Sequence, residues 1–432
     1  MYFTRFIKSS QFQRIKNSKI AADSFWAVFG NGFGYALLLL SGIIIARFLG
    51  KDVYGEYGMV KSTMLYIAGF ATMGLGITST KYIAEFIKKD NTQIKSLARD
   101  AMFITLIASS VIAILLAIFA HPLANYLDTP TLALPFQILG CLIIFKAITT
   151  TQNGILAGFS NFKIIARNNV VCSIYMLAAA APLTYFFGLK GALAALLSTQ
   201  AMNCILNYIK LHALLSSLQN QVNVNRKKEL FLFSFPIAIQ ESSYTICQWG
   251  GTILLVKMSS IGELGIFSAV SQWNAIITFI PGLLSNVILS HLSSSIDDSN
   301  RHNKTIKLML CVNLACTLTP FAIIYFWAPW VATFYGTSFH GMTPVLRVYT
   351  FCTIFTCCSN IFTSELIVTH HNWLLMIIRF FRDCSIFLLA IVFLYRSKGA
   401  HGALYYAWAN VIVSALYILT LAGVYKFKIK KD

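Results

Sequence analysis

Long apolar stretches alternate with short polar segments along the whole chain, and this pattern predicts helices that span a membrane. About 20 apolar residues cross the hydrocarbon core of a bilayer as one helix. Continuous apolar runs favour helices over the alternating strands of a membrane barrel. The predicted fold is an all-α polytopic membrane protein with twelve spans. They cover residues 24–46, 58–79, 101–120, 132–153, 170–187, 191–209, 231–256, 264–288, 306–327, 343–367, 374–394 and 402–424.

Composition supports this fold class. Hydrophobic residues make up 57% of the 432 residues and charged residues 11%, which is unlike an ordinary soluble domain. The first apolar run follows a basic stretch but continues for more than 20 residues without a small-residue cleavage site. It is therefore predicted to be a retained helix and not a signal peptide. The ten cysteines lie mostly within spans and lack metal-binding spacing, so no metal site and no cofactor are expected.

The net charge of +19 is distributed by topology. Lys and Arg gather before the first span and in the segments after spans two, four, six, eight and twelve, whereas the alternate segments hold few. The positive-inside rule then places both termini in the cytoplasm, and nucleic-acid binding is not expected. The connecting segments leave no room for a soluble catalytic domain, and no phosphate-binding glycine-rich loop is present. The chain is predicted not to be an enzyme.

The second half of the sequence repeats the first at an offset of about 210 residues. Residues 54–60 align with 264–270, Pro135 with Pro344, and residues 190–193 with 401–404. This internal repeat predicts an N-lobe of helices 1–6 over residues 1–215 and a C-lobe of helices 7–12 over residues 216–432. A duplicated membrane bundle is a common plan for a transporter that alternates access around a site between its halves.

Charged residues inside the spans identify candidate functional positions, because charge in a bilayer usually faces a protein-lined cavity. Lys146 shares a helical face with Thr149 and Asn153, which indicates either a water-filled lumen or a lysine that reaches the membrane interface. Lys61 and Arg347 allow the same two interpretations. Cations outnumber acids within the spans, so a cavity here would be cationic and would favour an anionic cargo such as a phosphate.

Acidic residues within the spans are candidate sites for a coupling ion. Glu241 and Glu365 are predicted to bind H⁺ or Na⁺, although Glu241 would also fit a structural ion pair with a lysine such as Lys146. Arg379, Arg382 and Asp383 are predicted to form a local ion pair, since Arg379 and Asp383 are four residues apart.

Several short motifs carry a family resemblance. Residues 46–50 with Tyr54-Gly55-Glu56-Tyr57, residues 74–85, residues 264–269 and residues 400–404 occur in an order and spacing that resembles the O-antigen flippases of the multidrug/oligosaccharidyl-lipid/polysaccharide exporter superfamily. The resemblance implies two six-helix lobes in a V, related by a pseudo-two-fold axis along the membrane normal. It also implies an undecaprenyl-pyrophosphate-linked oligosaccharide as cargo, flipped from the cytoplasmic to the periplasmic leaflet of the bacterial inner membrane. Lys81, Glu85 and Arg301 are implied cytoplasmic gate residues.

Together these observations predict alternating access through a cationic lumen, with H⁺ or Na⁺ coupling, membrane lipids around the protein and other polysaccharide assembly proteins as partners. A drug/cation antiporter of the same superfamily, a membrane polysaccharide polymerase or ligase, and a scaffold of a glycan assembly complex are the alternatives. The pyrophosphate is assigned to Lys146, Arg347 and Lys61. The sugars are assigned to Thr149, Asn153, Gln240, Gln248 and Gln272.

Overall fold

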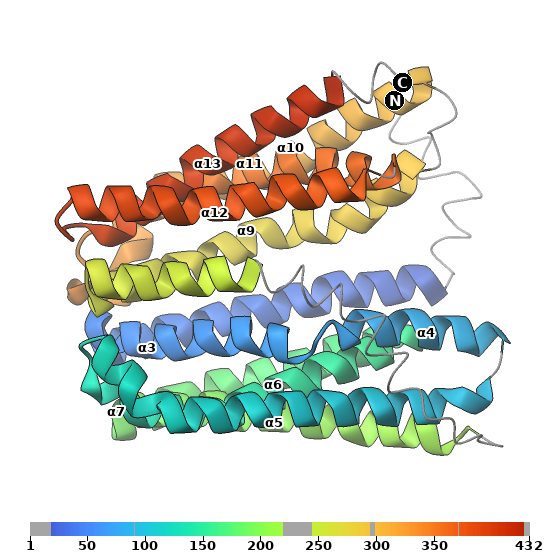
Figure 1. Ribbon diagram of the computed structural model, residues 1–432, viewed down its shortest axis with the longest axis horizontal. Helices are drawn as coiled ribbons and strands as arrows, with labels where there is room; N and C mark the ends of the chain where they lie inside the picture. The colour runs from blue at the N-terminus through green and yellow to red at the C-terminus, as the bar shows by residue number, and fades with distance from the viewer. Residues whose placement is uncertain (1–18, 90, 219–243, 294–298, 370, 427–432) are drawn as a thin grey trace.

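The computed structural model describes residues 19–89, 91–218, 244–293, 299–369 and 371–426, and every element in these ranges is a helix. Figure 1 shows the helices lying along the long axis of the molecule in two groups. The N-lobe contains α3 (Lys19–Ala71), α4 (Leu75–Lys89), α5 (Ile94–Tyr126), α6 (Ala133–Gly158) and α7 (Phe162–Ser216). The C-lobe contains a helix over residues 244–258, then α9 (Ile261–Ser293), α10 (Ser299–Tyr335), α11 (Met342–Val368), α12 (Asn372–Arg396) and α13 (Gly402–Val424). Short 3₁₀ turns are η1 (Asn91–Gln93), η2 (Pro130–Leu132) and η3 (Thr337–Phe339).

Two of these elements are hairpins of two helices. A straight helix of 55 residues such as α7 would be about 80 Å long. Instead, α7 turns at Gly188 (φ 55°), and hydrogen bonds from Asn168 to Asn207 and from Thr199 to Met176 join its two halves. α3 turns at Gly50 (φ 70°) and doubles back in Figure 1. Positive φ favours glycine at both turns.

The predicted spans agree with the helices. Eight helices in the described ranges are long and apolar enough to cross a membrane, and two of these are the hairpins α3 and α7. The multi-pass all-α fold is therefore confirmed, whereas the total of twelve crossings stays a prediction. The predicted span 58–79 is interrupted at residues 72–74, where Met73 (φ 49°) and Gly74 (φ 71°) leave the helical region. The predicted span 231–256 is described only from residue 244 onward.

Burial follows the membrane setting. Helices of both lobes contribute to one apolar core, whose largest fully buried side chains include Tyr54, Tyr57, Phe136 and Tyr335. Large apolar side chains also cover the outside, for example Phe186 with 73% of its surface exposed. A soluble monomer rarely exposes so much apolar surface, but a lipid-facing surface requires it.

Candidate functional site

The lobes meet where α3 packs against α9, and they meet through residues that the sequence repeat makes equivalent. A Cβ atom on Gly55 would lie 1.9 Å from the carbonyl oxygen of Ile261, and one on Gly265 would lie 2.1 Å from that of Lys51. Gly55 and Gly265 are 210 positions apart, as are Lys51 and Ile261. Such reciprocal contacts are what a two-fold axis between the lobes would produce. Only glycine permits this close backbone approach.

The same contact continues along both helices. A Cβ atom on Gly58 would lie 2.4 Å from the hydroxyl of Ser268, its repeat equivalent. One turn further along α9, Gln272 donates a hydrogen bond from Nε2 to the hydroxyl of Tyr54 (2.5 Å). Gln272, assigned to the sugars from sequence, therefore joins the two lobes in this conformation. We call this contact, formed by residues 51–58 and 261–272, the seam.

Exposed polar contacts lie beside the seam. The Lys257 ammonium donates to the backbone oxygen of Tyr126 (2.8 Å) and to the carboxylate of Asp128 (2.5 Å), so it links the C-lobe to the N-lobe. The Asp128 side chain is 77% exposed and that of Lys257 38% exposed. Ion pairs in such a setting contribute about 0.2–1 kcal/mol. The seam itself must then account for most of the contact between the lobes at this end.

At the opposite end the two lobes diverge, and α4 lies there (Figure 1). The implied gate residues Lys81 and Glu85 are one turn apart on α4, and the Lys81 ammonium lies 5.6 Å from the centre of the Tyr82 ring. Arg301 belongs to α10 in the other lobe, and its side chain lies outside the described residues. The gate therefore stays a prediction.

Lys61 lies close to the seam. It follows Gly58 by one helical turn on α3, so it continues the face that packs against α9. Because Gly55 pairs with Gly265 and Gly58 with Ser268, the same register brings Lys61 level with Ser271. The side chain is half-buried, and in the described part of the chain its ammonium has no hydrogen bond or ion pair.

Lys146 lies on the α6 face that packs against the second half of α7. Asn207 on α7 donates to the side-chain oxygen of Asn153 (2.9 Å), and these residues are 54 positions apart. The same offset brings Lys146 level with Gln200. Thr149, between Lys146 and Asn153, is 1% exposed. Lys146 is half-buried, and its ammonium has no partner among the residues the structure describes. The predicted stripe therefore faces the interior of the N-lobe.

Asparagines on α7 and α3 extend this polar interior. Asn168 donates to Asn207 (2.9 Å), Asn203 donates to Asn169 (3.2 Å), and Asn169 donates to Asn31 on α3 (3.0 Å). The sequence prediction missed this ladder. A signal was available, since residues 200, 203 and 207 fall on one helical face of the sixth predicted span.

Several buried polar atoms on the two facing helices lack a partner. They are Thr149 Oγ1 and Gln152 Oε1 on α6, and Gln200 Oε1 and Asn203 Oδ1 on α7. A buried polar atom without a hydrogen bond costs about 1–3 kcal/mol. The atoms next to Lys146 are thus hydrogen-bond acceptors that suit hydroxyl donors, either of water or of a sugar.

Two cationic side chains of the C-lobe, Arg347 and Arg382, have partners. Nε of Arg347 donates to the backbone oxygen of Tyr325 (3.2 Å), and its guanidinium lies 5.3 Å from the centre of the Tyr325 ring. Asp383 accepts from Arg382 (2.7 and 2.9 Å). The predicted local ion pair among Arg379, Arg382 and Asp383 is therefore present, and the adjacent Arg382 is the residue that reaches the carboxylate with two donors.

Glu365, predicted to bind a coupling ion, has a basic partner. Its carboxylate is 2% exposed and accepts from Nε2 of His302, on α10, at 2.9 Å. No pattern in the sequence indicates this contact, because the two residues are 63 positions apart on different helices. Of the remaining predicted residues, Gln248 is half-buried on the helix over residues 244–258, and Gln240 and Glu241 lie outside the described residues.

Comparison with solved structures shows which known proteins share this fold. The chain superposes with a TM-score of 0.77 and 16% identity on the inward-facing conformation of a multidrug resistance MATE family transporter of the MOP superfamily, covering 91% of this chain and 96% of that one. The outward-facing conformation of a MATE family transporter of that superfamily gives 0.62 at 16% identity, with 95% of each chain covered. The lipid II flippase MurJ, in an inward closed conformation, gives 0.71 at 15% identity over 92% of this chain and 87% of that one. The chain therefore shares its fold with membrane transporters of the MOP superfamily.

The family follows from the sequence. A family model described as polysaccharide biosynthesis protein matches residues 20–289, more than half of the chain. The chain therefore belongs to the polysaccharide biosynthesis protein family, and the predicted resemblance to polysaccharide flippases of this superfamily is confirmed. No curated protein sequence matches the chain.

Proposed function

We propose that this protein flips an undecaprenyl-pyrophosphate-linked, O-antigen-type oligosaccharide from the cytoplasmic to the periplasmic leaflet of the bacterial inner membrane. It does so by alternating access between two six-helix lobes, with twelve crossings and both termini in the cytoplasm. The lipid tail stays in the bilayer while the pyrophosphate and the sugars pass between the lobes.

The observation that carries this proposal is the pair of half-buried lysines without partners, Lys61 beside the seam and Lys146 inside the N-lobe. An ammonium in low dielectric without a counter-charge is costly, so an anionic ligand gains by supplying that charge. Pyrophosphate is such an anion. The acceptors near Lys146 on Gln152, Gln200 and Asn203 would take hydrogen bonds from sugar hydroxyls.

The arrangement of the lobes supports an inward-facing state. The higher TM-score is with the inward-facing MATE structure, and the seam closes the end that carries Lys257, which the charge pattern assigns to the periplasm. The end with α4 would then open to the cytoplasm, and Lys81, Glu85 and Arg301 would form its gate. Cargo binding can shift the equilibrium between the two states only through its differential affinity for them.

The test is deletion of the gene in its host, followed by analysis of lipid-linked oligosaccharide in sealed spheroplasts. We expect an undecaprenyl-pyrophosphate oligosaccharide to accumulate where external lectins and enzymes do not reach it, with loss of one surface polymer. Re-expression of the wild-type chain should reverse both effects. Normal surface polymer without accumulation, in a strain shown to have no second flippase, would contradict the proposal.

A drug/cation antiporter is the second candidate, because the fold also matches a multidrug resistance transporter. Cationic drugs are expected to need acidic and aromatic groups in the binding region. The unpaired charges seen on the described helices near the seam and in the N-lobe are lysines instead. A drug-susceptibility screen of the deletion strain separates the two candidates, since only the antiporter predicts increased susceptibility with normal surface polymer.

A further inference from the structure

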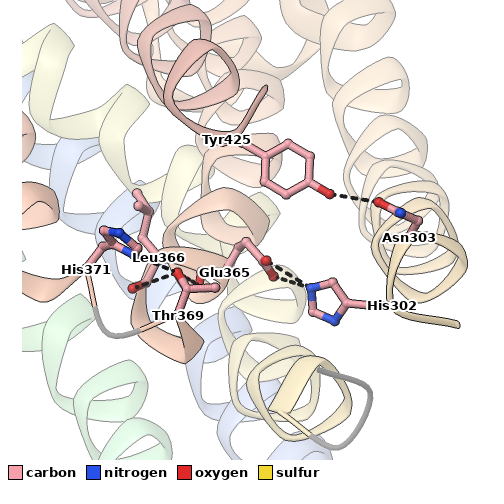
Figure 2. A network of polar contacts seen from close by, with 7 residues as sticks. All are labelled: His302, Asn303, Glu365, Leu366, Thr369, His371 and Tyr425. Atoms are coloured by element: carbon pink, nitrogen blue, oxygen red, sulfur yellow. Dashed lines mark hydrogen bonds and ion pairs between the residues drawn. The ribbon is translucent and has the colours of Figure 1, made fainter. Parts of the chain in front are cut away.

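A buried acid and an imidazole face one another in the C-lobe. Nε2 of His302 lies 2.9 Å from both carboxylate oxygens of Glu365, and Figure 2 shows the ring pointing at the carboxylate. We propose that the Glu365–His302 pair is the coupling site of the transporter and that the ion it binds is H⁺, not Na⁺. This inference rests on the function proposed above.

The net charge of the pair changes by one unit when a proton binds or leaves. When the imidazole is doubly protonated and the carboxylate is ionised, the net charge of the pair is zero. When one proton leaves to water, the pair is anionic and the buried Glu365 carboxylate has lost its counter-charge, which is strongly unfavourable in low dielectric. Imidazole exchanges a proton near neutral pH, whereas lysine or arginine in this position would stay charged. Occupancy of the site therefore responds to the pH difference across a membrane.

The geometry suits a proton better than a sodium ion. Hard cations are held by several oxygen ligands. Here both oxygens of Glu365 face a ring nitrogen. Ile306, one turn after His302, and Ile361, one turn before Glu365, belong to an apolar cluster with Ile288 and Leu292 of α9. In the residues that the structure describes, no cluster of three or more His, Cys, Asp or Glu side chains forms near the pair or elsewhere.

Other titratable and charged groups lie near the pair, on α10 and just after α13. Tyr425, just after α13, donates to the side-chain oxygen of Asn303 (2.9 Å), the neighbour of His302. Burial raises the pKa of Tyr425, and the Glu365 carboxylate raises it further, so this hydroxyl keeps its proton. On α10 Lys304 and Lys307 are exposed, as is Lys426 after Tyr425, and the side chain of the adjacent Arg301 lies outside the described residues.

A second histidine, His371 at the N-cap position of α12, contacts a hydroxyl at the end of α11. The ring of His371 lies 3.1 Å from the Thr369 hydroxyl, which in turn donates to the backbone oxygen of Glu365 (Figure 2). This chain of contacts reaches the backbone and not the carboxylate. His371 therefore influences the Glu365–His302 pair only through the end of the helix.

The pair is placed to link protonation to helix movement. It joins α10 to α11, and the Tyr425–Asn303 bond joins the end of α13 to α10. His302 is 12% exposed and Glu365 2%, so water reaches the pair through the imidazole. α13 ends at the wide end of the molecule in Figure 1, the end assigned to the cytoplasm. A proton taken up from the periplasm in the outward state would thus leave to the cytoplasm in the present state.

The first test needs no cargo. The thermal unfolding midpoint of the purified full-length protein is measured from about pH 5 to about pH 8. Because loss of the imidazole proton would leave the buried Glu365 carboxylate without its counter-charge, the proposed site predicts that the wild-type midpoint falls as the pH rises through that range. This step should be absent in Glu365→Gln and His302→Gln. Tyr425→Phe is the matched control, since it removes a neighbouring hydrogen bond and should lower the midpoint equally at every pH. A step that persists in both Gln variants would overturn the proton site.

The second test measures coupling in proteoliposomes with a trapped pH indicator. The probe is lipid-linked oligosaccharide extracted from the deletion strain. Wild-type protein should move protons when the probe is added. In both Gln variants this proton flux should be lower than in the wild type by on the order of tenfold or more. Probe translocation that follows a Na⁺ gradient and survives His302→Gln would overturn the inference. If wild-type protein translocates no probe, the proposed function fails, and the pH step still reports whether the pair binds a proton.

Discussion

In the N-lobe, Lys61 and Lys146 have ammonium groups without a partner among the described residues, whereas in the C-lobe Arg347, Arg382 and Glu365 each have one. The lobes nevertheless meet through equivalent residues at the seam, Gly55 with Gly265 and their neighbours. The backbone contact is thus symmetric while the charges are not.

The repeat makes this asymmetry explicit. At an offset of 210, Lys61 corresponds to Ser271, and at the offset of 209 set by Pro135 and Pro344, Lys146 corresponds to Phe355 and Glu365 to Leu156. Each charge is therefore present in one half only. We infer a division of roles, in which the N-lobe supplies charge for an anionic cargo and the C-lobe holds a titratable pair. The predictions below test that division.

The largest effect is expected at Lys146. Lys146→Ala should lower flipping about 10- to 100-fold, because losing a hydrogen bond to a charged group costs about 1.5–3 kcal/mol. Arg347→Ala should lower flipping by less than about threefold, since Tyr325 already binds that guanidinium. Flipping is measured as lectin-accessible oligosaccharide in spheroplasts at equal protein level. Lys190→Ala, which removes an exposed lysine, is the control. Equal losses in the Lys146 and Arg347 variants would contradict the division between lobes.

The seam glycines should give matched effects in the two lobes. Gly55→Ala and Gly265→Ala each place a Cβ atom within 2.1 Å of a carbonyl oxygen of the other lobe, so each should destabilise the closed seam by about 1–3 kcal/mol. The measurement is the thermal midpoint of the purified variants. Gly69→Ala on α3 and Gly282→Ala on α9 are controls, because nothing lies within 4 Å of either position. A large effect at only one seam glycine would show that the two lobes do not contribute equally to the stability of the contact.

A smaller effect is expected from moving the charge across the seam. Lys61→Ser should reduce flipping about tenfold, equivalent to about 1.4 kcal/mol. Adding Ser271→Lys to this variant returns a lysine at the same level from the other lobe and should recover most of the activity. Recovery would show that charge at this depth matters more than the lobe that carries it. No recovery, with the double variant folded and expressed, would assign the role to Lys61 in the N-lobe alone.

Apolar patterning made most of the fold predictable. Runs of about 20 apolar residues gave the helices, because a bilayer leaves the backbone little choice. The hairpins at Gly50 and Gly188 and the break at residues 72–74 needed the actual backbone, since the pattern does not tell a turn from a kink. The internal repeat identified the equivalent motifs on α3 and α9. It did not predict that these two motifs contact one another.

The candidate site was less predictable, for a physical reason. Helical periodicity relates residues on one helix, so it grouped Lys146, Thr149 and Asn153 correctly. It carries no information on contacts between helices, and so it missed His302 beside Glu365. Gln272 was assigned to the sugars because it is polar, but its hydrogen bond to Tyr54 lies across the seam. Such contacts depend on packing and not on spacing.

The smallest effect should come from the exposed link beside the seam. Lys257→Met removes the contacts with Asp128 and the Tyr126 backbone, but exposed ion pairs contribute only about 0.2–1 kcal/mol, so flipping should change less than about fivefold. High salt should mimic the substitution in the wild type and leave the variant unchanged, because salt screens exposed charges. The initial rate in proteoliposomes at low and high salt measures both. A loss as large as that of Lys146→Ala would mean that this link, and not the glycine contact, keeps the lobes together at the seam. The symmetric backbone contact would then have a smaller role than its geometry indicates.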